Sequence, residues 1–175
     1  MSNLTERIRQ TIRDIPDFPI EGIIFKDITP VLSDPVLLAD VIEDMASRFE
    51  GEKIDAVVGM ESRGFLFGTP LALRLGAAFV PARKPGKLPY DSVKVEYALE
   101  YGTNTLEMHV DALKAGDRVL VVDDLLATGG TAKATIHLVE KLGAKVSACL
   151  FMVELGFLNG RGSLGDVRVE SQIIY

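Results

Sequence analysis

The chain has 175 residues, of which 47% are hydrophobic and 25% charged, and its formal net charge is −6. These values are typical of one soluble globular domain, and the acidic balance argues against a nucleic-acid partner. A single cysteine, Cys149, excludes an internal disulfide and fits a reducing cytosol. No apolar stretch suggests a signal peptide or a membrane span, so we expect a cytoplasmic protein with no membrane partner.

The first third of the chain is predicted to contain two helices separated by an irregular segment. Residues 4–13 have helical spacing. Residues 15–22 are rich in proline, which favours an extended or turn-like backbone. Asp34 and Pro35 then open a helix that runs to about residue 49, because proline is well tolerated in a first helical turn.

Strands and helices alternate through the rest of the chain. The predicted strands are 54–60, 77–81, 118–123 and 145–154, and the predicted helices are 64–75 and 132–142. This alternation indicates βαβ units, so we expect an α/β fold with a mostly parallel central sheet flanked by helices. After a loop over 81–92, residues 93–100 and 105–110 are expected to form a hairpin or flap, and residues 167–175 to form a final edge strand.

The segment from Val119 to Thr131 carries the strongest functional signal. Four apolar residues predict a strand buried on both faces, and Asp123 and Asp124 stand at its carboxyl end. The loop Ala127–Thr131 then leads into a helix. Open α/β sheets bind ligands beyond the carboxyl ends of their strands, and a helix N-terminus binds anions. Because carboxylates accept hydrogen bonds from a sugar diol, the segment predicts a ribose 5-phosphate site.

Two common phosphate motifs do not fit this segment. It lacks the Gly-Lys-Ser/Thr of a Walker loop and the Gly-x-Gly-x-x-Gly of a dinucleotide-binding fold. An ordinary βα turn with a polar cap is the alternative for any single Thr-Gly-Gly. The apolar strand, the paired aspartates and the loop together favour a binding site over that alternative.

The segment resembles the phosphoribosyl pyrophosphate (PRPP) motif of the type I phosphoribosyltransferase family, and in particular its adenine-specific branch. The resemblance extends in order through Gly22–Ile28, Glu61–Gly68, Arg83–Pro89 and Leu99–Gly102, and covers roughly residues 12–161. It implies a single phosphoribosyltransferase domain over 1–175, with an N-terminal hood over about 1–33 and a core over about 34–160. It also implies a flexible loop or flap and a homodimer.

The resemblance assigns roles residue by residue. PRPP phosphate and ribose binding falls to Asp123, Asp124, Ala127, Thr128, Gly129, Gly130 and Thr131. Pyrophosphate binding falls to Ser62, Arg63, Gly64, Arg83, Lys84 and Lys87. Adenine binding falls to Ile24, Phe25, Lys26 and Leu155, and Glu100 with Tyr101 are the expected catalytic pair in a lid that excludes water. Mg²⁺ is expected to be held mainly by PRPP, with Asp123 and Asp124 reaching it through water.

Residue 127 bears on the choice of base. Phosphoribosyltransferases for 6-oxopurines resemble this motif but typically carry Asp where this chain has Ala127, which argues against hypoxanthine and guanine. The resemblance therefore implies transfer of the 5-phosphoribosyl group from PRPP to adenine, giving AMP and pyrophosphate.

A xanthine enzyme is the nearest enzymatic alternative. A non-catalytic PRPP sensor is the alternative from another class. Lys26 stands where the family commonly has Arg, which matters only if the side chain rather than the backbone contacts the base.

Overall fold

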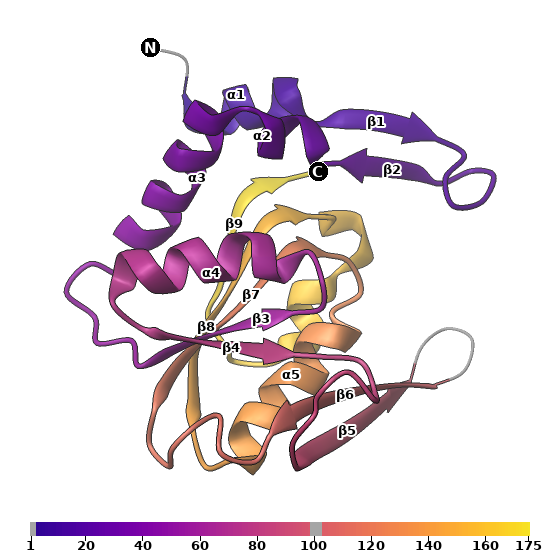
Figure 1. Cartoon of the computed structure of the whole chain (residues 1–175). Helices are drawn as coiled ribbons and strands as arrows, with labels where there is room; N and C mark the ends of the chain where they lie inside the picture. The colour runs from indigo at the N-terminus through magenta and orange to yellow at the C-terminus, as the bar shows by residue number, and fades with distance from the viewer. Residues whose placement is uncertain (1–2, 99–102) are drawn as a thin grey trace.

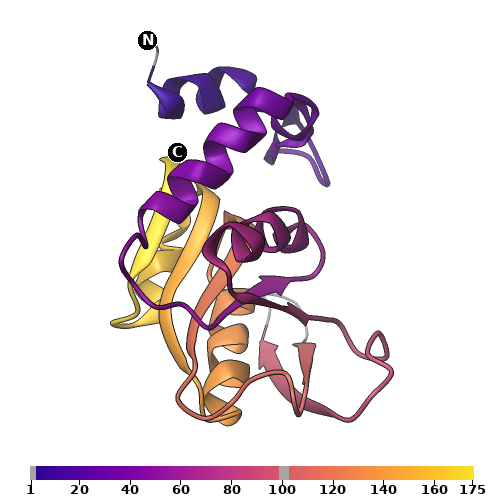
Figure 2. The same ribbon diagram turned by 60° about the vertical axis from the view of Figure 1, so that its left-hand side comes forward.

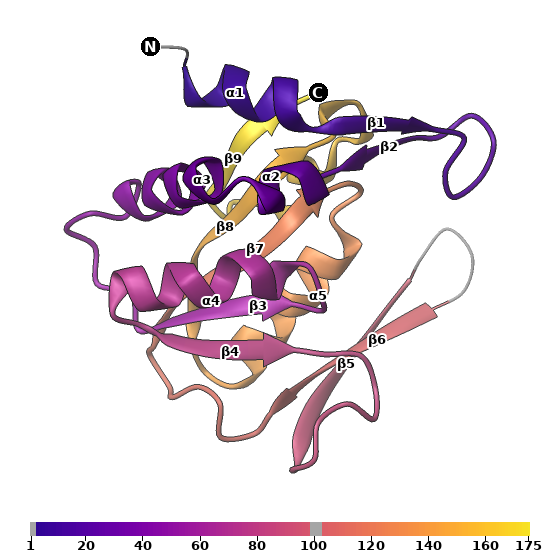
Figure 3. The same cartoon turned by 45° about the horizontal axis from the view of Figure 1, so that its top comes forward.

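A computed structural model describes residues 3–98 and 103–175 of the chain. Its centre is a five-stranded parallel sheet in the order β4-β3-β7-β8-β9, seen in sequence from bottom to top in Figure 3. The strands are β3 (Ala56–Met60), β4 (Ala78–Ala82), β7 (Arg118–Leu126), β8 (Lys145–Glu154) and β9 (Val169–Ile174). The predicted α/β fold with a parallel sheet is confirmed. The predicted final strand is β9, at one edge of this sheet.

Helices cover both faces of the sheet. The helices α3 (Pro35–Ser47) and α4 (Gly64–Leu75) lie on one face, and α5 (Gly130–Lys141) lies on the other (Figure 1). Successive residues of β7 alternate between the two cores: Leu120 and Val122 pack with α3 and α4, and Val119 and Val121 pack with α5. All four of these side chains are fully buried, which confirms the strand predicted to be buried on both faces.

The strand β7 is longer than predicted. It extends to Leu126, three residues past Asp123, because Leu125 and Leu126 continue the parallel pairing with Val153 and Glu154 of β8. Asp123 and Asp124 therefore lie within the strand and share its rigid backbone. The sheet also continues beyond residue 160, since β9 pairs with β8 over residues 169–174.

The N-terminal residues form a hood above one end of the sheet (Figure 1). It consists of α1 (Leu4–Thr11), β1 (Arg13–Pro16), β2 (Ile24–Asp27) and the short α2 (Thr29–Ser33). The antiparallel pairing of β1 with β2 was not predicted, because prolines hide a strand that is only four residues long. Two cross-strand ion pairs stabilise it: Arg13 with Asp27 at 2.6 Å and Lys26 with Asp14 at 2.8 Å.

A second antiparallel hairpin lies at the end of the molecule opposite the hood (Figure 2). It consists of β5 (Ser92–Ala98) and β6 (Thr103–His109), and its apolar side chains pack with α5. The predicted hairpin is confirmed. The expected catalytic residues Glu100 and Tyr101 fall between its strands and lie outside the described residues.

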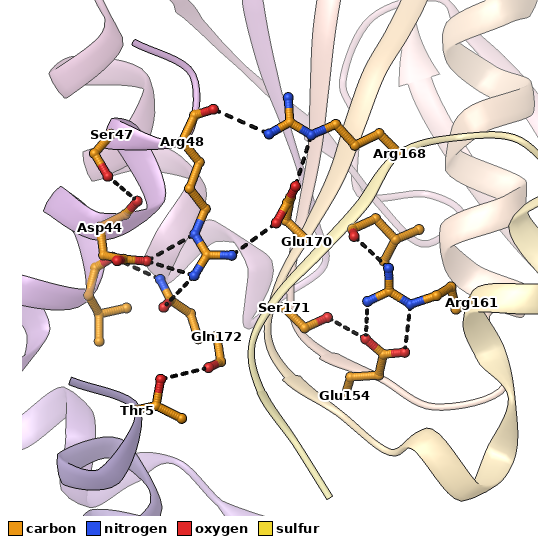
Figure 4. Close-up of polar contacts among 12 residues, drawn as sticks. Thr5, Asp44, Ser47, Arg48, Glu154, Arg161, Arg168, Glu170, Ser171 and Gln172 are labelled. Atoms are coloured by element: carbon orange, nitrogen blue, oxygen red, sulfur yellow. Dashed lines mark hydrogen bonds and ion pairs between the residues drawn. The ribbon is translucent and has the colours of Figure 1, made fainter. Parts of the chain in front are cut away.

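A polar network at the free edge of the sheet joins β9 to its neighbours (Figure 4). Arg48, at the end of α3, pairs with Asp44 at 2.8 Å and with Glu170 of β9 at 3.0 Å. Next to it, Arg161 donates two hydrogen bonds to the buried carboxylate of Glu154 at 3.1 and 2.7 Å.

No helix in the described parts of the chain has the length and apolar character needed to cross a bilayer.

Candidate active site

A polar cavity of about 290 Å³ opens beyond the carboxyl ends of β3 and β7, as expected for a parallel sheet. We call it the strand-end cavity. Its wall includes the end of β3, the segment 123–132 and three residues of the β5–β6 hairpin. Of the expected site residues, it gathers Arg63, Lys84, Asp123, Asp124, Ala127, Thr128, Gly129, Gly130 and Thr131. The predicted PRPP loop and part of the predicted pyrophosphate group thus share one cavity.

The loop Ala127–Thr131 lines this cavity at the start of α5. Gly129 is the N-cap of the helix and has φ +86°, a conformation that side-chain-bearing residues rarely adopt. Its Cα faces Ser163 and Gly160 so closely that an added Cβ would lie 2.7 Å from the Gly160 carbonyl oxygen. The first turn of α5 leaves free N–H groups, so the loop is suited to bind a phosphate.

A turn far along the chain supports this loop from behind. The Ser163 hydroxyl donates to the carbonyl oxygens of Thr128 at 3.0 Å and Gly160 at 2.7 Å. Arg161 anchors this turn, because its guanidinium binds Glu154 and the Val169 carbonyl oxygen (Figure 4). Hydrogen bonds from Arg161 hold the pKa of Glu154 below its usual value. These supporting residues carry no local signal and were not predicted.

Two adjacent aspartates line the floor of the cavity, Asp124 buried and Asp123 half-buried. The Asp124 side chain is 3% exposed. The backbone N–H of Asp124 donates to the Asp123 carboxylate at 2.9 Å. Burial raises the pKa of the Asp123 carboxyl well above its usual range, and the neighbouring Asp124 charge raises it further. Burial also raises the pKa of Asp124, although the Arg63 guanidinium opposes that shift. Two carboxylates held this way can accept hydrogen bonds from hydroxyl groups or bind a cation.

Arg63 connects the cavity with the hood. Its Nε lies 2.9 Å from Asp124 Oδ2 in an ion pair whose geometry is not that of a hydrogen bond. Its guanidinium carbon lies 5.5 Å from the centre of the Phe25 ring, within range of a cation–π contact. Ser62 is exposed, whereas Gly64 is buried where an added Cβ would meet the Val122 carbonyl oxygen at 2.5 Å. The Glu61–Gly64 turn is thereby packed onto β7.

The basic loop after β4 borders the same cavity. Glu61 accepts from the Lys84 N–H at 2.8 Å and from Arg83 Nε at 3.3 Å. Burial alone would raise the pKa of Glu61, but these two donors hold it below its usual value. Arg83 Nη1 also reaches the Lys87 carbonyl oxygen at 3.4 Å, and the exposed Lys87 does not line the cavity. Lys84 is therefore the member of this loop that faces the cavity.

A second cavity of about 380 Å³ lies under the hood, and we call it the hood cavity. Three expected adenine residues line it, namely Ile24, Lys26 and Leu155, together with Tyr175 and the exposed Phe157. The fourth, Phe25, lies on the same strand outside this lining. The Phe25 ring packs edge-on against Phe18 at 5.2 Å and faces Arg63. Phe25 therefore stands between the two cavities.

The hairpin contributes two polar cavity residues, in addition to Leu106, that were not predicted from the sequence. Tyr97 of β5 and Asn104 of β6 are paired across the hairpin, and both line the strand-end cavity. The Tyr97 hydroxyl lies 3.3 Å from the Thr131 hydroxyl of the phosphate loop. Strand alternation places Tyr97 on the inner face, but the 34 residues that separate it from Thr131 hide this contact in the sequence.

Cys149 is not part of either cavity. Its side chain is fully buried in the core under α5, and burial raises the pKa of its thiol to about 12. A thiol in that state is not a nucleophile at neutral pH.

The chain is similar to known proteins over nearly its whole length. The phosphoribosyl transferase domain model matches residues 29–162. An adenine phosphoribosyltransferase from Anaeromyxobacter sp. is 56% identical over 175 residues, covering 100% of this chain and 99% of the relative. The crystal structure of adenine phosphoribosyltransferase from Thermoanaerobacter pseudethanolicus has a TM-score of 0.95 at 54% identity, covering 98% of this chain and 99% of that one.

A yeast structure adds ligands to the comparison. The adenine phosphoribosyltransferase of Saccharomyces cerevisiae, complexed with an imino-altritol bisphosphate and adenine, has a TM-score of 0.92 at 41% identity. It covers 98% of this chain, and this chain covers 99% of it. The fold of this chain is therefore shared with these enzymes. The chain belongs to the phosphoribosyltransferase family, among the adenine phosphoribosyltransferases.

Proposed function

We propose that this chain transfers the 5-phosphoribosyl group from PRPP to adenine at the strand-end cavity, giving AMP and pyrophosphate. The observation that carries this proposal is the juxtaposition of the phosphate loop 127–131 with the adjacent carboxylates of Asp123 and Asp124 in one cavity. The loop offers N–H donors for the 5′-phosphate, and the carboxylates offer acceptors for the ribose diol. The yeast relative binds a sugar bisphosphate analogue together with adenine, which matches these two kinds of subsite.

The pyrophosphate would leave toward the basic rim of the cavity. Arg63 and Lys84 line the cavity, and Arg83, next to Lys84 in the chain, forms an ion pair with Glu61. As the bond between C1′ and pyrophosphate breaks, negative charge develops on the leaving oxygen, and positive groups fixed in advance stabilise it. Adenine N9 forms the new bond to C1′ and gives up its proton. By resemblance, Glu100 accepts that proton with Tyr101 as its loop partner.

The adenine base would lie at the hood. Ile24 and Leu155 supply apolar surface in the hood cavity. By resemblance to the family, the Phe25 ring, which lies outside that lining and beside Arg63, would stack on the flat base. Backbone groups of Ile24 and Lys26 would read the edge of the ring. Ala127 has no ionisable side chain to face a 6-oxopurine, which supports adenine as the base.

Magnesium fits the donor set of the cavity. Asp124 Oδ2 is buried and accepts no hydrogen bond among the described residues, and two adjacent carboxylate oxygens are ligands that Mg²⁺ prefers. Within the described residues no group of three or more candidate ligand side chains occurs. This suits an ion that takes most of its ligands from substrate phosphates and water. When bound, Mg²⁺ would neutralise the pyrophosphate charge, and Asp123 and Asp124 would hold it in place.

We also propose a cytoplasmic homodimer, on the basis of the family resemblance. The exposed Leu66 and Leu73 on α4 offer apolar surface for a second copy. Sedimentation equilibrium of the purified chain is expected to give twice the mass of 19.0 kDa. A monomer at micromolar concentration would overturn this assembly without affecting the assignment of the reaction.

The choice of base is tested directly by turnover. Purified protein with PRPP and Mg²⁺ is expected to convert adenine to AMP, and to give at most about one hundredth of that rate with xanthine, hypoxanthine or guanine. Preference for another purine would retain the PRPP half of the proposal and reject the base half. PRPP binding without turnover of any of the four bases would favour a non-catalytic sensor.

The role of the hairpin is tested at Tyr97. Changing Tyr97 to Phe removes the hydroxyl beside Thr131 and is expected to lower kcat/KM for PRPP about fivefold, the usual effect of one neutral hydrogen bond. Tyr90→Phe is the matched control, because Tyr90 is exposed and packs against His109 outside the cavity lining. Equal kinetic constants for the two variants would show that the Tyr97 hydroxyl takes no part in phosphate binding.

A further inference from the structure

Two cations of the hood lie against the ring of Tyr175, which follows β9. Lys26 Nζ is 3.9 Å from the ring centre, and the Arg9 guanidinium carbon is 4.8 Å from it. Both distances are within the range of cation–π attraction. Arg9 also donates to the carbonyl oxygen of Ile174 at 3.1 Å. Residues from α1 and β2 therefore meet at one aromatic ring.

The ring itself is anchored to the core. The Tyr175 N–H donates to the Glu154 carbonyl oxygen at 2.9 Å, and the Tyr175 carbonyl oxygen accepts from the Gly156 N–H at 3.0 Å. These bonds attach Tyr175 to the segment after β8, which carries Leu155. Figure 1 shows the end of the chain next to β2, below the rest of the hood. Tyr175 is thus the point at which the hood strand meets the sheet.

The side chain of Lys26 is fully engaged in this contact. Its ammonium binds both carboxylate oxygens of Asp14, at 2.8 and 2.9 Å, in addition to the Tyr175 ring. The side chain is only 13% exposed. Because the charge is used within the hood, the backbone of Lys26 is the part available to a base. Residue 26 thus needs a cation to contact the Tyr175 ring, and either lysine or arginine would supply one.

We propose that Tyr175 is a positioning residue for the base subsite. Its ring contacts Lys26 of β2, and Lys26, Ile24 and Leu155 line the same cavity, so this contact fixes β2 relative to Leu155. Tyr175 acts through β2 and leaves the phosphate loop untouched, since the strand-end cavity does not include it. This inference rests on the proposed function and adds a determinant of base affinity that lies outside both phosphate subsites.

Two substitutions at one position test the proposal. Tyr175→Leu retains apolar packing but removes the π face, and it is expected to raise KM for adenine about fivefold, the value for loss of a partly buried cation–π contact. KM for PRPP is expected to stay within about twofold of the wild-type value, because the phosphate cradle is unchanged. Tyr175→Phe keeps the π face and is expected to restore KM for adenine to within about twofold.

A double-mutant cycle identifies the partner of the ring. Lys26→Met keeps the length of the side chain and removes its charge, so it should raise KM for adenine as Tyr175→Leu does. The KM of the double variant for adenine should exceed that of Lys26→Met by at most about twofold. Lys26→Met already removes the contact with the Tyr175 ring, together with the ion pair to Asp14. Fully multiplicative effects would overturn the pairing of Lys26 with Tyr175.

The outcomes separate this inference from the proposed function. If the wild-type chain does not convert adenine to AMP, the proposed function fails. If it does, and Tyr175→Leu leaves KM for adenine unchanged, the positioning role fails alone. A parallel rise in KM for adenine and PRPP, with a lower melting temperature, would show a general structural role and would also overturn the proposal.

Discussion

Changing Asp123 and Asp124 together to Asn is expected to lower kcat/KM for PRPP by about a hundredfold or more, while the fold is retained. The two carboxylates lie on the rigid strand β7, at the floor of the strand-end cavity and beside the phosphate loop. Hydrogen bonds to a charged acceptor contribute about 1.5–3 kcal/mol each, and the amides weaken two such acceptors at once. Initial rates over a range of PRPP concentrations at fixed adenine measure the change.

The same variant is expected to melt at or above the wild-type temperature at pH 7–8. The pKa of Asp123 in the folded state lies above its value in the unfolded chain, so the folded state binds this proton more tightly than the unfolded chain does. The stability that this proton supplies is lost as the pH rises through the folded-state pKa. An amide at residue 123 avoids that loss. The advantage of the variant should therefore shrink as the pH falls toward 4.

A matched control uses exposed aspartates. Asp91→Asn with Asp111→Asn removes the same charge from the surface and is expected to leave kcat/KM for PRPP within about twofold of wild type. If the cavity variant and the surface variant have the same activity, the assigned role of the aspartate pair is wrong. A large fall in melting temperature of the cavity variant would instead contradict the electrostatic account.

Changing Gly129 to Ala is expected to destabilise the protein by about 3 kcal/mol and to lower kcat/KM for PRPP at least tenfold. A φ of +86° strains any residue with a Cβ, and the new methyl group would collide with Ser163 and Gly160. Relief of that collision must move the loop that carries the phosphate-binding N–H groups. Thermal unfolding should show a fall of about 9 °C.

Gly51→Ala separates backbone strain from loss of the site. Gly51 has φ +80°, yet an added Cβ there meets nothing within 4 Å. It should cost about 1 kcal/mol, or about 3 °C, and leave the kinetic constants unchanged. If Gly129→Ala behaves like Gly51→Ala in both stability and kinetics, close packing behind the phosphate loop is not required for PRPP use.

Most of the fold could be predicted because its signals are local. The helix 64–75 and the strand 145–154 were predicted with the bounds that α4 and β8 have. The four apolar residues before Asp123 predicted a buried central strand because a parallel sheet buries both of its faces. The hood hairpin was not predicted, since β1 forms only by pairing with a strand that follows a proline-rich loop.

The sequence by itself predicted the α/β fold and the position of the loop 127–131 after a buried strand, because strand, carboxylates, glycines and helix start all fall within thirteen consecutive residues. Only the tertiary structure decided what surrounds that loop. Tyr97 reaches Thr131 across 34 positions, Ser163 reaches Thr128 across 35, and Arg9 reaches Ile174 across 165. Such contacts depend on how separate elements pack against one another, and no spacing within the chain encodes them.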